Sequence, residues 1–385
     1  DRIGIGLTVL VVKYFFKNNL NSGNTNILFS IAKKGSYLPF HQMYSQVFTS
    51  ALTVGFGGSA GLESPIVSTG AAIGSNFGST YKLNYKDRTL LLAAGAAGGI
   101  AGAFNAPIAG VLFALEVILV DISISAFIPL LIAAASGALL SKIILHESSL
   151  LFFKLKQPFD YNNVFLYIVL GLLAGVTSLY YVNFFDKVET RFSKIKSGFA
   201  KWLIGGISLA FLFALFPSLF GEGYESIKAL SEFRPEDLFK DSIVLGLISN
   251  KWILLIFIAL TLLLKSVAAA ITLGSGGNGG NFAPSLFVGA YLGFVFSLFL
   301  ILIGFDAIPV SNFTIVAMAG ILSGVFHAPL TAIFLIAEIT GGYELIIPLM
   351  IVSSISYVIV KRFHPESLDV KRLKARGRSY PSKTL

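Results

Sequence analysis

Long apolar runs with few charges recur along the whole chain. They lie at about 3–16, 90–119, 122–145, 163–185, 200–220, 242–274, 283–305, 313–340 and 344–360. A helix that crosses a bilayer needs about 20 apolar residues. The pattern therefore predicts an all-α, polytopic membrane protein.

Several of these runs are broken by glycine and proline rather than by charge. Gly95 to Gly102 is followed by Asn105-Ala106-Pro107, and Ser323-Gly324 is followed by His327-Ala328-Pro329. A helix broken within the membrane leaves backbone groups unpaired, which is tolerated only where protein or a polar cavity satisfies them. The breaks therefore indicate a functional site within the membrane.

The second break repeats the first. Residues 102–116 match residues 324–338 at an offset of 222, and the segment that begins at Pro65 matches the one that begins at Pro284 at an offset of 219. We predict a first transmembrane repeat over 1–190 (lacking part of its N-terminus), a second over 191–360, and a basic tail over 361–385. Such repeats commonly frame a site near the membrane midplane. Spacing alone does not decide between parallel and inverted repeats.

Composition supports the membrane assignment. Apolar residues make up 55% of the chain and charged residues only 13%, against about 25% charged in soluble domains. The net charge of +9 is concentrated in the tail and in the loop 186–201. Basic clusters beside apolar spans mark the cytoplasmic face, so we expect a cytoplasmic C-terminus and no nucleic-acid partner. The absence of cysteine excludes disulfides and cysteine metal sites.

Two glycine-rich segments have the character of an anion site. Gly57–Pro65 and Gly274–Pro284 each place glycines, then proline, before an apolar stretch. Proline suits the first turn of a helix, and helix N-termini attract anions through their free N–H groups. The alternative is that the glycines merely allow close helix packing. Because both segments occupy the same place in the repeat, we favour an anion site built from backbone N–H groups.

Three acids that lie in or beside the predicted spans are interpreted differently. Glu63 lies at the mouth of the first predicted helix, and its repeat equivalent is Phe282, so the acid is not a requirement of the repeat and is assigned a function. Glu116 and Glu338 are repeat equivalents of each other, which favours a shared structural role as hydrogen-bond acceptors. His327 is replaced by Asn105 in the other repeat, which favours a polar loop role. No metal-binding or catalytic motif is present, so neither an enzyme nor a cofactor or metal site is expected.

These motifs together resemble the CLC family of chloride channels and chloride/proton antiporters. Gly61-Leu62-Glu63-Ser64-Pro65 is similar to the family's Gly-Arg-Glu-Gly-Pro, and Gly280-Asn281-Phe282-Ala283-Pro284 to its Gly-x-Phe-x-Pro. The stretches 104–107 and 328–331 are also family-like. The resemblance implies two inverted-topology repeats with broken and re-entrant helices, a homodimer with one anion pathway per subunit, and a gate at Glu63.

The resemblance also implies the residues that bind the anion. The family's Gly-Ser-Gly-Ile-Pro is matched only around Ser22, for which an ordinary polar loop is the alternative. The expected anion-binding residues are Ser22, Gly23, Gly61, Ser64, Gly280, Asn281, Phe282 and Ala283.

Two positions depart from the family pattern. Val117 stands where antiporters of the family usually carry an inner glutamate, and Asp369 stands where a tyrosine usually contacts the central anion. An ionised Asp369 would repel that anion, so we expect it to point away, to be protonated, or to leave the central site weakly occupied.

The sequence thus predicts chloride transport gated by Glu63, channel-like or weakly proton-coupled, in the plasma (inner) membrane. The alternatives are a coupled chloride/proton antiporter and a non-transporting membrane sensor of this fold. The expected partners are chloride and other small anions, membrane lipids, a second copy of the chain and, where transport is coupled, protons.

Overall fold

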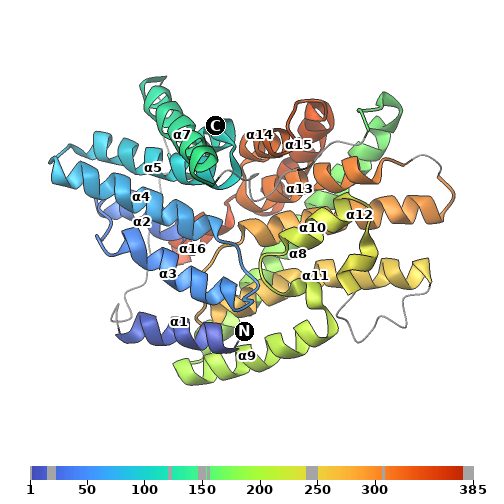
Figure 1. Cartoon of the computed structure of the whole chain (residues 1–385), viewed down its shortest axis with the longest axis horizontal. Helices are drawn as coiled ribbons and strands as arrows, with labels where there is room; N and C mark the ends of the chain where they lie inside the picture. The colour runs from blue at the N-terminus through green and yellow to red at the C-terminus, as the bar shows by residue number, and fades with distance from the viewer. Residues whose placement is uncertain are drawn as a thin grey trace.

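The computed structural model describes residues 2–14, 23–119, 124–145, 153, 157–239, 250–305 and 308–375. These residues form a bundle of helices of unequal length and tilt (Figure 1). The elements from the N-terminus to residue 163 are α1 (Arg2–Tyr14), α2 (Asn24–Lys33), α3 (Gln42–Gly55), α4 (Glu63–Thr80), α5 (Tyr85–Phe104), α6 (Pro107–Phe113), the π-helical η1 (Ala114–Ile118), α7 (Ile124–Leu145) and η2 (Tyr161–Asn163). They are followed by α8 (Val164–Lys194), α9 (Gly198–Leu215), η3 (Pro217–Leu219), α10 (Tyr224–Ser231), η4 (Pro235–Phe239), α11 (Lys251–Gly274), α12 (Phe282–Leu302), α13 (Val310–Phe326), α14 (Pro329–Ile339), α15 (Ile346–Phe363) and α16 (Leu368–Ala375).

Six helical stretches of the described residues are long and apolar enough to cross a membrane. They are Ala126–Ile144, Tyr161–Lys194, Gly198–Leu215, Lys251–Gly274, Phe282–Leu302 and Ile346–Lys374. Much of α7 and α9 exposes apolar side chains, as expected of surfaces that face lipid. The protein is an integral membrane protein, which confirms the prediction from the apolar runs.

The two long interrupted runs are broken where the sequence predicts. Asn105 ends α5 and His327 ends α13, and both adopt the left-handed conformation, with φ of 52° and 56°. That conformation is uncommon outside glycine, although asparagine and histidine adopt it more readily than most residues. In each repeat a proline then begins the next helix, Pro107 in α6 and Pro329 in α14. The polar loop role expected for His327 agrees with this position.

The acids that follow the breaks cap each other's helices across the two halves. Glu338 of α14 accepts hydrogen bonds from the backbone N–H groups of Ile108 (3.0 Å) and Ala109 (2.8 Å) at the start of α6. Glu116 of η1 accepts them from Leu330 (3.0 Å) and Thr331 (2.7 Å) at the start of α14. The shared structural role predicted for the two acids is confirmed.

Equivalent pairs of helices in the two repeats pack against each other in the same way. α4 packs on α5 as α12 packs on α13. A Cβ atom at Gly74 would overlap the carbonyl of Leu91, and one at Gly293 would overlap the carbonyl of Phe313. Only glycine permits this approach at the two equivalent positions. The boundary between the repeats at residue 190 stays a prediction.

Candidate functional site

The two glycine-rich loops meet at the centre of the bundle. Gly61 and Gly280 form a pair of antiparallel backbone hydrogen bonds, 2.9 Å from Gly61 N to Gly280 O and 2.8 Å in the reverse direction. α4 begins at Glu63 and α12 at Phe282, just beyond this pair. The N-termini of two helices from opposite halves of the chain therefore face one small region, which concentrates N–H groups and positive potential.

Glu63 lies across this junction. Its side chain is only 1% exposed. The Tyr224 hydroxyl donates to Oε1, and the backbone N–H of Ala283 donates to Oε2 at 3.4 Å. A Cβ atom at Gly61 would overlap Oε2 and crowd Ala283, so a larger residue there would displace the Glu63 carboxylate. The carboxylate lies over the N-terminus of α12, the position that the helix end makes favourable for an anion.

The structure brings most of the predicted anion-binding residues together. Ser64 is buried against Gly280, and Asn281 and Ala283 flank Phe282 at the start of α12. The Phe282 ring packs between the rings of Phe104 (5.6 Å between centroids) and Phe326 (5.5 Å), which are repeat equivalents. Gly23 immediately precedes α2. Ser22 lies outside the described residues.

Asp369 points toward the first turn of α2. Its carboxylate accepts hydrogen bonds from Asn24 Nδ2 (3.2 Å) and Thr25 Oγ1 (3.1 Å). Which of the three arrangements expected for Asp369 holds stays a prediction, because Ser22 lies outside the described residues. Val117 is half-buried in η1, directly after the helix-capping Glu116.

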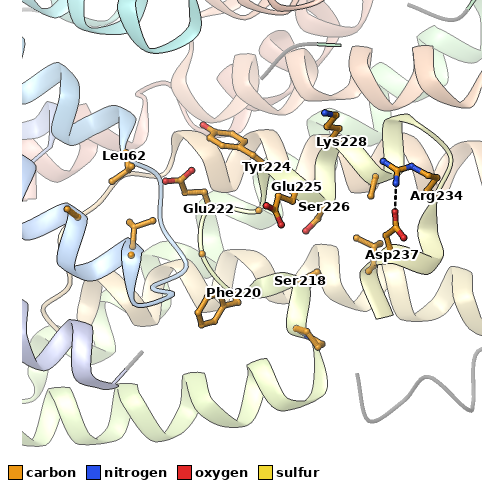
Figure 2. Close-up of a pocket in the computed structure, with 18 residues that line it drawn as sticks. Leu62, Ser218, Phe220, Glu222, Tyr224, Glu225, Ser226, Lys228, Arg234 and Asp237 are labelled. Carbon is orange, nitrogen blue, oxygen red and sulfur yellow. Dashed lines mark hydrogen bonds and ion pairs between the residues drawn. The ribbon is translucent and has the colours of Figure 1, made fainter. Parts of the chain in front are cut away.

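A cavity of about 960 Å³ opens beside Glu63. It lies between the end of α3, the segment 217–223, and the α10–η4 region, and Figure 2 shows side chains that line it. Leu62 and Tyr224, neighbours of Glu63 in the chain and in space, form part of its wall. The Arg234–Asp237 ion pair, at 2.6 Å, lies in another part of the lining.

Sequence reasoning missed three polar residues in this region. Lys265 of α11 is fully buried, and its Nζ donates to the carbonyls of Gly221 (2.9 Å) and Leu219 (3.3 Å). Tyr224 binds Glu63, and Glu222 lines the cavity. Lys265 could have been found as the cation in the middle of the apolar stretch 252–274, and the other two from the pair of glycines that surrounds Glu222.

Electrostatics distinguish Glu222 from an ordinary surface acid. Burial and the nearby negative charge of Glu63 raise the pKa of the Glu222 carboxyl to about 7, and the positive charge of Lys265 opposes the rise. Glu222 therefore exchanges protons near neutral pH.

Comparison with known sequences gives one consistent result. A family model described as voltage gated chloride channel matches residues 4–361. A putative chloride channel protein, ClcB-like, from Ralstonia nicotianae is 30% identical over 362 residues, covering 91% of this chain and 79% of the relative. The voltage-gated ClC-type chloride channel ClcB of Escherichia coli is 28% identical over 323 residues, covering 83% of this chain and 72% of the relative.

Solved structures share the fold. A slow cyanobacterial Cl⁻/H⁺ antiporter superimposes with a TM-score of 0.81 at 24% identity, covering 97% of this chain and 86% of the other. A CLC-type fluoride/proton antiporter superimposes with a TM-score of 0.76 at 24% identity, covering 95% of this chain and 85% of the other.

Proposed function

The chain belongs to the voltage-gated chloride channel family, and we propose that it carries chloride across a membrane along a pathway that Glu63 gates. In this proposal the N–H groups at the start of α4 and α12 replace part of the hydration shell of the ion. Selectivity for anions then comes from helix N-termini rather than from a ring of basic side chains.

One observation carries the proposal. The Glu63 carboxylate lies over the N-terminus of α12 and accepts from Ala283 N and the Tyr224 hydroxyl. A carboxylate held in this way competes with a free anion for the same donors. Protonation removes its charge and weakens its hold on those donors, so loss of charge on Glu63 frees the junction for chloride.

The test is chloride efflux from liposomes that contain the purified Glu63→Gln variant. Glutamine is nearly isosteric with the acid but carries no charge, so we expect a permanently open pathway whose flux depends only weakly on pH. Glu225→Gln, which neutralises an exposed acid on α10, is the matched control and should behave like the wild type. Loss of chloride flux in Glu63→Gln, with normal flux in the control, would refute the gate assignment.

We further propose channel-like or weakly proton-coupled transport. Val117 supports it, because its side chain cannot carry a proton at the position where related antiporters usually have an acid. The coupled antiporter is the second candidate, since solved antiporters share this fold. A wild type that passes neither chloride nor protons would favour the non-transporting sensor instead.

The orientation and assembly are also proposals. Ion pairs from Lys371 to Asp186 and from Arg372 to Glu189 place α16 beside the end of α8. The two basic clusters of the chain therefore lie on one face, which supports a cytoplasmic C-terminus. A position in the plasma (inner) membrane and a homodimer stay predictions from the charge pattern and the family.

A further inference from the structure

The cavity approaches Glu63 but is separated from it by a wall. Leu62 and Tyr224 line the cavity, while Glu63 behind them is 1% exposed. A proton that binds Glu63 from the cavity must therefore cross this wall. Figure 2 shows the Glu222 carboxylate directed to the space between the Leu62 and Tyr224 side chains.

Backbone contacts fix Glu222 in this place. Gly221 N donates to Gly57 O at 3.1 Å, which ties the segment to the first glycine-rich loop. Gly223 has a φ of 92°, and a Cβ there would overlap the Phe287 ring. The Lys265 ammonium, which lies 4.6 Å from the centroid of that ring, binds the Gly221 carbonyl. These contacts hold the segment 221–223, and with it Glu222, in one position.

Glu222 also lies between charges of opposite sign. Glu63 interacts with it repulsively and Lys265 attractively, and Glu222 in turn acts on the Tyr224 hydroxyl. Lys265 directs two of its three N–H groups to the carbonyls of Leu219 and Gly221, and its charge acts on Glu222. The other charged groups of the cavity lining are Glu225, Lys228, Arg234 and Asp237, the last two paired with each other.

Building on the proposed function, we propose that Glu222 relays protons from the cavity to Glu63 through the Tyr224 hydroxyl. Cavity water protonates the Glu222 carboxylate. The carboxyl proton then passes to the Tyr224 oxygen while the Tyr224 hydroxyl proton passes to Glu63 Oε1. Glu222 returns to its ionised form, Tyr224 stays neutral and Glu63 becomes neutral, so charge and protons balance.

The test uses the protein reconstituted in liposomes. The pH on the cavity side is lowered rapidly, and the rate at which chloride flux then rises is measured. In the wild type this rate should increase as pH falls through about 7, because the protonated fraction of Glu222 increases. Glu222→Gln should lose that inflection and respond about a hundredfold more slowly, the usual contribution of a positioned proton-transfer group. Glu222→Asp keeps an acid on a shorter side chain and should respond at an intermediate rate.

Glu225→Gln is the matched control, since it removes an acid from the same cavity without facing Glu63, and it should keep the wild-type rate. A purely electrostatic role for Glu222 would move the equilibrium midpoint of the pH response but leave the rate unchanged, and that result would overturn the relay. An unchanged Glu222→Gln profile would overturn it as well.

Failure of the relay differs from failure of the proposed function. Normal chloride flux that depends on Glu63, with a wild-type response in Glu222→Gln, refutes only the relay. Absent flux in the wild type, or loss of flux in Glu63→Gln, refutes the gate and the relay that depends on it. A Glu222→Gln protein that elutes aggregated from gel filtration is replaced by Glu222→Ala, which also lacks the acid and for which a wild-type rate refutes the relay.

Discussion

A single carboxylate at Asp369 changes the chemistry of the α2 N-terminus. Asn24 and Thr25 donate from that first turn to the Asp369 oxygens, at 3.2 and 3.1 Å. Such donors would otherwise be available to a mobile anion. Asp369 therefore occupies two side-chain donors in the first turn of α2.

Replacing Asp369 by asparagine should strengthen anion binding at this end of the pathway. The amide oxygen can still accept a hydrogen bond, but the negative charge is removed. The expected gain is about fivefold in chloride affinity, since a charge near a helix end contributes roughly 1 kcal/mol. Isothermal titration of the purified variant with chloride measures it.

Glu366→Gln provides the comparison for that measurement. Glu366 lies three residues earlier and is paired with Lys374 rather than with α2, so its neutralisation should leave chloride affinity as in the wild type. Equal affinities of Asp369→Asn and the wild type would mean that Asp369 exerts no repulsion on the bound anion.

At this scale the sequence predicted residues that belong to local motifs. Glu63 was identifiable because it lies in a glycine-rich loop and has no acidic equivalent in the second repeat. Its contact with Tyr224 spans 161 residues of sequence, and the contacts of Asp369 with α2 span about 345. No local pattern specifies such long-range pairs, since they depend on how the helices pack.

Among the elements, the broken helices are the ones whose ends need hydrogen-bond partners from elsewhere in the chain. A helix that starts within the membrane leaves N–H groups without partners. Glu338 satisfies two of them on α6, and Glu116 satisfies two on α14. The two halves of the chain are therefore held together at the helix ends that the breaks create.

This exchange of caps predicts a measurable difference between the two acids. Glu116 also accepts a hydrogen bond from the Thr331 hydroxyl at 2.7 Å, whereas the equivalent position opposite Glu338 is Ala109. Glu338→Ala should lower the unfolding free energy by about 2 kcal/mol, and Glu116→Ala by about 1 kcal/mol more. Thermal unfolding in detergent gives the order of the two variants.

The control for the caps is Glu344→Ala, because Glu344 is an exposed acid between α14 and α15. It should unfold at the wild-type temperature. A Glu338→Ala variant as stable as this control would show that water replaces the lost acceptor without cost.

The element boundaries were the most predictable level of the structure. Proline, glycine and the asparagine or histidine before them mark the breaks directly, and the repeat makes each break visible twice. The helices α2, α3, α10 and α16 were not predicted. All four lie outside the apolar runs, so hydrophobicity gives no signal for them.

Across the whole molecule, groups able to exchange protons are distributed unevenly. The cavity side has Glu222 beside Tyr224 and Glu63. Toward η1, Glu116 is bound to the α14 N-terminus and is followed by Val117. α9 connects the basic loop 186–201 to the segment of the cavity lining around Pro217 and is long and apolar enough to cross a membrane. A crossing α9 puts the cavity on the face opposite the basic clusters. We infer that protons reach the gate mainly from that face.

This asymmetry predicts chloride transport with little net proton movement. Liposomes loaded with chloride should release it rapidly once a potassium ionophore relieves the electrical potential, and simultaneous recording of external pH should detect far fewer protons than chloride ions. The physical reason is that a proton which binds Glu63 from the cavity has no acid at Val117 to receive it and returns to the cavity.

A fixed ratio of protons to chloride, or chloride movement driven by a pH gradient alone, would contradict the prediction. In that case Asp369 would be a candidate for the inner carrier, and Asp369→Asn should abolish the coupling while chloride still passes.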